Sequence, residues 1–401
     1  MNRPDKKNTP LLLFTILLAG TLHGQSNTQV AQNTRDTSRY WEIRQAIRVS
    51  NIQLRKDSTN PELYLYRSVY KRELNELDGA MQDITKALFL NPKYVDAYMC
   101  RGWLKEMKED YQGAIADYQK GVALDPANSK ALVTMAMAKY HAKDYAGALA
   151  DLNKDITLNP TDWEGYNDLG FIKNDRGDHK GAIADLDKAI ALDPSKFESY
   201  SSRALAKREL RDFSGALPDY NQALALAPGL ADVLLGRAET KYGLKDLDGA
   251  LQDANRVLAL GLHTAYAYLI RGYIEFDSRN HRAAILDFDT AIVLQPDNPE
   301  AYNNRGMSRH FLQDEQGAFR DINKAIDLRP TYSKAYSNRA LVKYTLEDYK
   351  GAIPDFTKAI EFNPAFADAY VYRGYSYEKI GEAGMARADA QKAASLMVEK
   401  K

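Results

Sequence analysis

Apolar residues recur along the chain in two alternating amphipathic segments, and the whole pattern repeats every 34 residues from Pro61 to Lys400. Position 20 of this unit is an alanine in all ten copies: Ala80, Ala114, Ala148, Ala182, Ala216, Ala250, Ala284, Ala318, Ala352 and Ala386. Each segment has about 14 residues, which is too short for a stable isolated helix in water. The pattern therefore predicts an all-α chain whose paired helices stack as one continuous solenoid.

Five further positions of the unit indicate how its two helices are joined and packed. Position 8 is always small, which lets the helices approach closely, and aromatic residues at positions 4 and 24 fill the space around it. Position 16 is Asp in seven units, and Asp is a preferred N-cap of the helix that follows it. Position 32 is Pro in eight units, where it ends the second helix.

The 34-residue frame divides the chain into defined segments. The ten predicted repeats are residues 61–94, 95–128, 129–162, 163–196, 197–230, 231–264, 265–298, 299–332, 333–366 and 367–400. Residues 39–60 are predicted to form an N-terminal capping helix, because Ala46 falls in frame with position 20 of a second helix. The last helix is rich in Ala, Gln, Lys and Arg, as expected of an exposed end.

This combination of small residues, alanines and prolines resembles the tetratricopeptide repeat family over about 340 residues. The resemblance implies a right-handed superhelix of helical hairpins with a concave groove. Asp155 departs from the family's small residue at position 27, which predicts looser packing in unit three. Gly261 and Leu262 replace the usual Asp/Asn-Pro, which predicts a bend at residues 260–264, and Pro218 and Pro354 are expected to kink the starts of their helices.

In the resembled family, first-helix positions 2, 5, 6, 9, 12 and 13 line the concave face. The candidate groove residues are Trp103, Phe171, Tyr273, Met307 and Tyr375 at position 9, Tyr140, Tyr242, Phe276 and Tyr344 at position 12, and Asn303 at position 5. Asn167, Asn304 and Asn338 could also hold a peptide backbone. Position 9 has an alternative role, which is packing between neighbouring first helices. No unit combines Lys at position 5 with Asn at position 9, so the family's clamp for chaperone tails is disfavoured.

Charged residues also follow the frame. Position 23 is Asp in all ten units, position 7 is Arg in eight, and position 11 is Lys in seven. The carboxylates could bind a cation or basic ligand, but equal recurrence of both signs favours a structural ladder of Arg–Asp pairs. Met135 and Leu169 replace the arginine in units three and four. Pairing between adjacent units would leave Asp117 and Asp151 unpaired, and pairing within a unit would leave Asp151 and Asp185 unpaired.

Composition excludes several classes of function. Lys plus Arg and Asp plus Glu both number 54, so no net basic field recruits nucleic acid. The single cysteine, Cys100, excludes an intramolecular disulfide framework, and the six histidines show no metal-binding spacing. No phosphate-binding loop or nucleophile motif is present, so we expect neither cofactor, metal nor enzymatic activity.

The expected function is a scaffold that binds a protein or peptide in the groove, and the alternative is a self-associating structural protein.

The N-terminal residues have the pattern of a secretory signal. Arg3, Lys6 and Lys7 precede a short apolar run at residues 11–20, which is shorter than the roughly 20 residues of a membrane-spanning helix. We predict a signal peptide over residues 1–24 and a polar linker over 25–38, with an uncleaved membrane anchor as the alternative. An exported protein, periplasmic or extracellular and without a membrane span after cleavage, is expected, and assembly of a bacterial-type envelope is one candidate role.

Overall fold

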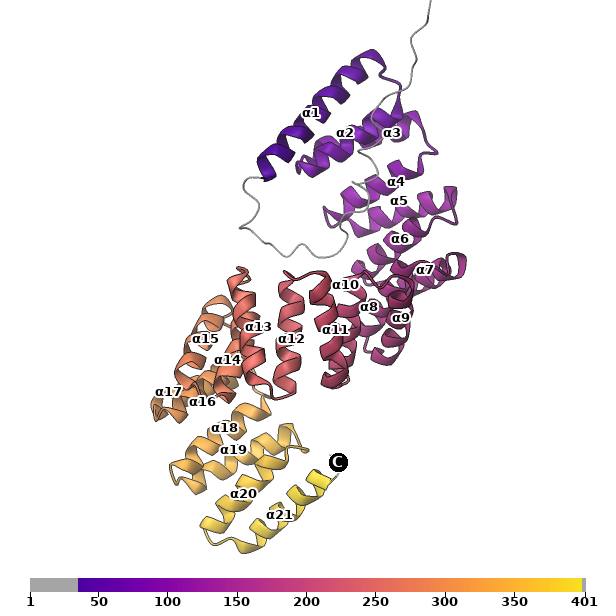
Figure 1. Cartoon of the computed structure of the whole chain (residues 1–401). Coiled ribbons are helices and arrows are strands. Elements are labelled where there is room, and N and C mark those ends of the chain that lie inside the picture. The colour runs from indigo at the N-terminus through magenta and orange to yellow at the C-terminus, as the bar shows by residue number, and fades with distance from the viewer. Residues whose placement is uncertain (1–34, 399–401) are drawn as a thin grey trace, which may run out of the picture.

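The computed structural model describes residues 35–398, which form the helices α1 to α21 and no strand (Figure 1). The first helices of successive pairs are α2 (Pro61–Glu73), α4 (Val95–Glu106), α6 (Ser129–His141), α8 (Trp163–Asp175), α10 (Phe197–Glu209), α12 (Ala231–Gly243), α14 (Ala265–Asp277), α16 (Pro299–Phe311), α18 (Ser333–Thr345) and α20 (Ala367–Lys379). The second helices are α3 (Leu77–Leu90), α5 (Tyr111–Leu124), α7 (Tyr145–Leu158), α9 (His179–Leu192), α11 (Phe213–Leu226), α13 (Leu247–Ala259), α15 (His281–Leu294), α17 (Glu315–Leu328), α19 (Tyr349–Phe362) and α21 (Ala383–Val398). The predicted all-α solenoid of helical pairs is confirmed.

The first helix, α1 (Arg35–Lys56), covers the start of the stack against α2. Arg67 of α2 donates through Nη1 to Oδ1 of Asn51 at 2.6 Å, and Leu54 is buried between the helices. The capping helix was predicted to begin at residue 39, but α1 begins at Arg35. Residues 35–38, predicted as the end of the linker, therefore belong to the helix. The predicted signal peptide over residues 1–24 lies outside the described residues and stays a prediction.

The turn between the helices of a pair depends on two adjacent positions. Position 15 takes a left-handed conformation in every pair, and in eight of them the residue is not glycine, with φ between 60° and 66°. The aspartate at position 16 then caps the second helix: Oδ1 of Asp110, for example, accepts the N–H of Gly113 at 2.9 Å. The same cap occurs at Asp144, Asp178, Asp212, Asp246, Asp314 and Asp348. The predicted N-cap role is confirmed.

The small residue at position 8 is required by the large side chain at position 24. A Cβ added to Gly102 would lie 2.4 Å from the ring of Tyr118, and one added to Gly272 would lie 2.6 Å from the ring of Phe288. The alanines at position 20 beside these contacts are fully buried from Ala80 to Ala352. In these two pairs no bulkier residue could enter position 8 without displacing its neighbours.

The Arg–Asp ladder exists, and its pairs lie within a unit. Arg237 donates through Nε and Nη2 to both carboxylate oxygens of Asp253, at 2.8 and 2.6 Å. Its Nη1 reaches Asn221 of the preceding pair at 2.9 Å, so one guanidinium joins three helices. Equivalent bidentate pairs join Arg67–Asp83, Arg101–Asp117, Arg203–Asp219, Arg271–Asp287, Arg305–Asp321, Arg339–Asp355 and Arg373–Asp389.

Units three and four retain their position-23 carboxylates without an arginine. The prediction that within-unit pairing would leave these two carboxylates unpaired is wrong, because the lysine at position 11 reaches them. Lys139 lies 2.5 Å from Asp151 and Lys173 lies 2.6 Å from Asp185. Met135 and Leu169, which replace the arginines, are buried. The contacts from arginine to the preceding pair are therefore missing at these two units.

Three predicted departures can be followed locally. Asp155 is fully buried, and its Oδ1 accepts from Nδ2 of Asn159 at 3.0 Å. A Cβ on Gly165 would lie 2.5 Å from Oδ2 of Asp155, so this glycine of the next unit makes room for the carboxylate, and the looser packing of unit three stays a prediction. Helix α13 ends one position early and Gly261 takes φ 83°, while α11 and α19 run through Pro218 and Pro354.

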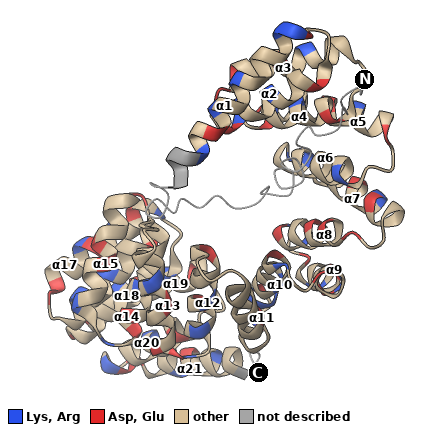
Figure 2. Ribbon diagram, turned by 45° about the horizontal axis from the view of Figure 1, so that its top comes forward, with Lys and Arg blue, Asp and Glu red and all other residues tan. Residues whose placement is uncertain are grey.

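The first helices form the inner side of the curved solenoid. Successive first helices contact one another, as α6 does α8 and α8 does α10, whereas the described second helices make no comparable contact with each other. The side with the closer spacing lies inside the curve. Figure 2 shows the curved path and the presence of acidic and basic residues on helices throughout it.

Candidate binding site on the concave face

Two pockets open on the first helices, in widely separated parts of the solenoid. We call them the acidic pocket, on α4, α6 and α8, and the polar pocket, on α18 and α20. First-helix residues at positions 2, 5, 6, 9, 12 and 13 form most of both linings, and these are the positions that the family resemblance assigns to the concave face. The repeat thus presents the same positions to the concave side in each unit. The residues at those positions differ between units, so the two pockets differ in polarity and charge.

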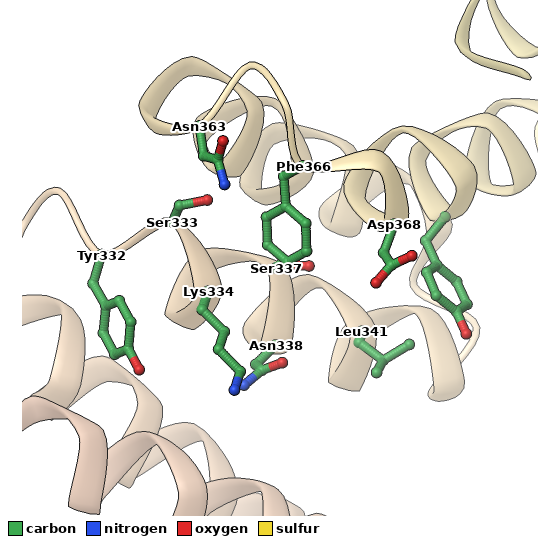
Figure 3. Close-up of a pocket in the computed structure, with 10 residues that line it drawn as sticks. Tyr332, Ser333, Lys334, Ser337, Asn338, Leu341, Asn363, Phe366 and Asp368 are labelled. Carbon is green, nitrogen blue, oxygen red and sulfur yellow. The ribbon is translucent and has the colours of Figure 1, made fainter. Parts of the chain in front are cut away.

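The polar pocket has a volume of about 520 Å³ and is drawn in Figure 3. Its lining is Tyr332, Ser333, Lys334, Ser337, Asn338, Leu341, Asn363, Phe366, Asp368 and Tyr372. Phe366 reaches from the loop before α20 toward Ser337 of α18, and Asp368 lies at the side of the ring (Figure 3). An apolar ring flanked by a lysine, a carboxylate and amides suits a peptide, which presents both apolar and polar groups.

The acidic pocket has a volume of about 450 Å³. Its lining is Trp103, Glu106, Met107 and Tyr111 on or beside α4 and α5, then Lys130, Val133, Thr134, Met137 and His141 of α6, then Glu164, Asp168 and Phe171 of α8. Three carboxyl groups thus share a small space with one lysine and with the rings of Trp103, Tyr111, His141 and Phe171. This pocket spans the two units in which arginine is absent from position 7.

Aromatic contacts hold the walls of the acidic pocket. The Arg72 guanidinium lies over the Trp103 ring, with its central carbon 3.6 Å from the ring centroid. Tyr111 stacks on His141 with centroids 5.6 Å apart, and Phe171 meets Tyr140 edge-on at 5.5 Å. These contacts join neighbouring helical pairs, so the walls are positioned before any ligand arrives.

The carboxyl groups of the acidic pocket are strongly affected by burial. Burial raises the pKa of Glu106, and the O–H of Tyr118, which donates to its Oε2 at 2.7 Å, acts in the opposite direction. Burial and the charge of Asp162 raise the pKa of Glu164, while Lys130 lowers it. Burial, followed by the charge of Glu164, raises the pKa of Asp168 to about 7. A group whose charge is disfavoured in this way gains from an added positive charge.

The ten predicted groove residues fall into three groups. Trp103 and Phe171 line the acidic pocket, and Tyr375 is 49% exposed. Tyr140, Tyr242, Tyr273, Phe276 and Tyr344 are half-buried and contact other residues: Tyr242 donates its O–H to Asp277 of the next pair at 2.6 Å, and Tyr344 meets Tyr372 edge-on at 5.8 Å. Asn303 and Met307 are buried, so the structure does not bring them to the groove surface.

Three of the predicted asparagines join neighbouring helices, and Asn304 bonds within its own helix. Nδ2 of Asn338 donates to Oδ1 of Asn303 at 2.9 Å, and the O–H of Ser199 donates to Oδ1 of Asn167 at 3.0 Å. Asn304 donates to the carbonyl of Glu300 at 2.7 Å. Of the four, Asn338 lines a pocket. The expectation that this set holds a peptide backbone is therefore reduced to that residue.

Sequence reasoning missed Asp168 and Glu106 as candidate site residues. Asp168 is the one acidic residue at position 6, where the other units carry neutral side chains. A carboxylate at a position that is otherwise neutral is the feature of the sequence that could have identified Asp168 as a site residue. The described residues contain no group of three His, Cys, Asp or Glu side chains arranged to hold a metal ion, and no described helix is long and apolar enough to cross a membrane.

Comparison with known proteins supports the repeat assignment. Models described as Tetratricopeptide repeat match residues 164–196, 201–267, 269–333 and 333–366. The solved structure of the APC/C hetero-tetramer Cut9–Hcn1 is similar over 90% of this chain and 92% of that chain, at 13% identity and a TM-score of 0.51. No protein with a curated description matches the sequence.

Two shorter repeat proteins are also similar. A tetratricopeptide repeat protein from Parabacteroides merdae matches over 63% of this chain and 97% of its own, at 19% identity and a TM-score of 0.48. YrrB, described as a TPR protein with an unusual peptide-binding site, matches over 46% of this chain and 95% of its own, at 21% identity and a TM-score of 0.41. Tetratricopeptide repeats are thus detected at residues 164–196, 201–267, 269–333 and 333–366, and the helical pairing of the described residues agrees with them.

Proposed function

We propose that this protein is a non-enzymatic interaction scaffold that binds a peptide or protein segment along its concave face. One observation carries the proposal: two separate pockets, at α4–α8 and at α18–α20, are built mainly from the same inward positions of the repeat. Proteins built from such repeats serve as interaction scaffolds, and stacked solenoids present extended concave surfaces.

The chemistry of both pockets fits a peptide. Aromatic and aliphatic side chains such as Trp103, Phe366 and Leu341 offer apolar contacts, and Lys334 and Asp368 offer charged ones. Aromatic anchors in a pocket with a polar surround are the usual source of affinity in peptide recognition. An extended or helical segment could use both pockets only by following the groove.

Selection from a library tests this function. Phage that display random dodecapeptides are enriched on the full-length protein, and synthetic versions of the enriched sequences are titrated by fluorescence anisotropy. We expect enriched sequences with micromolar Kd that compete with one another for one face. Failure to enrich any sequence above an unrelated helical protein would contradict the proposal.

A second candidate function is self-association, which one observation favours. Tyr40 and Trp41 on α1 are 51% and 62% exposed at the end of the stack, where a helical repeat normally carries a polar cap. Light scattering across a hundredfold range of concentration tests it. A mass that rises with concentration and reverts to the monomer in Trp41→Glu supports self-association, and a constant monomer mass contradicts it.

We further propose that the protein is exported and acts in the cell envelope. The support is the basic and then apolar pattern of the first 24 residues. Fractionation of cells that make the full chain, with mass spectrometry of its N-terminus, tests this. A mature N-terminus beyond the apolar run in the exported fraction is expected, and an intact chain in the cytoplasm would contradict it.

A further inference from the structure

We infer that the acidic pocket binds a cationic side chain, lysine or arginine, of the segment that occupies the groove, with Asp168 as its counter-ion. This inference rests on the proposed function and adds the ligand class that one part of the groove selects. It assigns a binding role to Asp168, which departs from the repeat pattern at position 6, so the repeated scaffold does not account for it.

The first support is the state of the Asp168 carboxylate. Asp168 is 1% exposed and lines the pocket, and its Oδ1 accepts from Nδ2 of Asn167 at 3.1 Å. Its other oxygen, Oδ2, is buried and has no hydrogen-bond partner among the described residues. A buried carboxylate oxygen without a partner is costly to the folded protein, and a ligand that donates to it removes that cost.

The second support is the charge around this group. The charged side chains that act on Asp168 are Glu164 of its own helix and Asp162 just before that helix, and both are negative. From α6, Lys130 acts on Glu164, and His141 has a pKa lowered by burial, which favours its neutral form. Glu106, the last residue of α4, adds a third carboxyl. Among the lining residues one lysine therefore faces three carboxyl groups, and an incoming cation would reduce the imbalance.

The third support is the aromatic lining, which favours an organic cation over a metal ion. Trp103 and Phe171 belong to the pocket, and the Arg72 guanidinium already lies 3.6 Å from the centroid of the Trp103 ring. This internal contact shows that the ring accepts a cation on its face. A metal ion would need three or more ligands in a converging arrangement, and none is present among the described residues.

The test uses n-butylammonium chloride, which has the charge and chain of a lysine side chain, at pH 8, where Asp168 is mainly ionised. The full-length protein is labelled with 5-fluorotryptophan, and its ¹⁹F resonances are assigned by changing Trp41, Trp103 and Trp163 to Phe one at a time. Sodium butyrate and sodium chloride at the same ionic strength are the control solutes. Asp168→Asn is the test variant, and Asp368→Asn in the polar pocket is the matched control.

We expect butylammonium, but not butyrate, to move the Trp103 resonance along a saturating curve. The apparent Kd should rise at least fivefold in Asp168→Asn and stay unchanged in Asp368→Asn, and circular dichroism confirms that both variants are folded. A Trp103 resonance that ignores butylammonium, or responds equally in Asp168→Asn, would overturn the inference. That result would leave the proposed function intact, because enrichment of dodecapeptides does not depend on this pocket.

Discussion

Nδ2 of Asn167 donates to Oδ1 of Asp168 at 3.1 Å, while Oδ2 of the same carboxylate has no hydrogen-bond partner among the described residues. Asn167, the neighbouring residue on α8, thus provides a hydrogen bond to one of the two oxygens of this buried carboxylate. The arrangement is costly when the group is ionised, because burial disfavours the charge and Glu164 repels it. A buried carboxylate that destabilises the folded protein is a candidate for ligand binding, because a ligand can donate to it. It should also lower the free energy of unfolding by a measurable amount.

We predict that Asp168→Asn stabilises the protein at high pH more than at low pH. The pKa of Asp168 is raised to about 7, so the native state holds its proton more tightly than the unfolded state does. The stability that this proton contributes is complete below about pH 4 and is lost as the pH rises through about 7, by up to about 4 kcal/mol. Thermal unfolding of both proteins from pH 4 to pH 8 should show a widening gap in Tm in favour of the variant. A gap that stays constant with pH would show that the carboxyl is not perturbed.

Arg237 should contribute more to stability than the lysine that shares its carboxylate partner. Arg237→Met removes two hydrogen bonds to Asp253 and one to Asn221 of the preceding pair, with an expected cost of about 2 kcal/mol. Lys241→Met removes one ion pair to Asp253 at 2.8 Å and should cost about 1 kcal/mol or less. Urea unfolding of the two variants measures the difference. Equal losses would contradict the role of the arginine in joining successive pairs.

The left-handed residues between paired helices offer a route to greater stability. Glu347 takes φ 64°, which costs a non-glycine residue roughly 1 kcal/mol, so Glu347→Gly should raise the Tm by an amount equivalent to about 0.5 kcal/mol. The matched control is the reverse change at the same position of the next unit, where Gly381 takes φ 87° and Gly381→Ala should lower the Tm. A decrease in Glu347→Gly would contradict the conformation assigned to this turn.

A methyl group at position 8 should be tolerated only where position 24 leaves room. Gly102→Ala would place a Cβ 2.4 Å from the buried Tyr118 ring, and we expect a loss of about 1–3 kcal/mol. Gly374→Ala, at the same position of the last unit and opposite the smaller Ala390, would bring its Cβ no closer than 3.3 Å to a neighbouring atom and should cost about 1 kcal/mol or less. Differential scanning calorimetry of the two variants distinguishes these outcomes, and similar Tm values would contradict the packing argument.

The 34-residue frame predicts the helical pairs, the aspartate caps and the Arg–Asp ladder because each is a local consequence of a recurring residue. The frame could not decide whether Asp253 pairs with Arg237 of its own unit or with a neighbouring unit, since both choices have the same period. Side-chain reach settles it: the arginine spans its own pair and also contacts the preceding one. The left-handed turn was missed because most of its residues are not glycine.

The candidate site was only partly predictable, because it depends on features that do not recur from unit to unit. Aromatic residues at inward positions include true pocket residues such as Trp103, but Met307 has the same position and is buried between helices. Burial depends on the sizes of neighbouring side chains, which the period of the pattern does not contain. Asp168 was overlooked because carboxylates are abundant on this chain, and its exceptional place at position 6 matters only once its burial is known.

Photo-cross-linking tests most directly whether the concave face is the binding surface. Benzoylphenylalanine replaces either Tyr375 of the first helix α20, which is 49% exposed, or Phe89 of the second helix α3, which is 75% exposed. Each protein is irradiated with a fluorescent dodecapeptide selected on the wild type, and the adduct is quantified by mass spectrometry. We predict a strong adduct at position 375, suppressed by unlabelled peptide, and only background at position 89. Equal labelling at both positions, or labelling at position 89 alone, would contradict binding on the concave face.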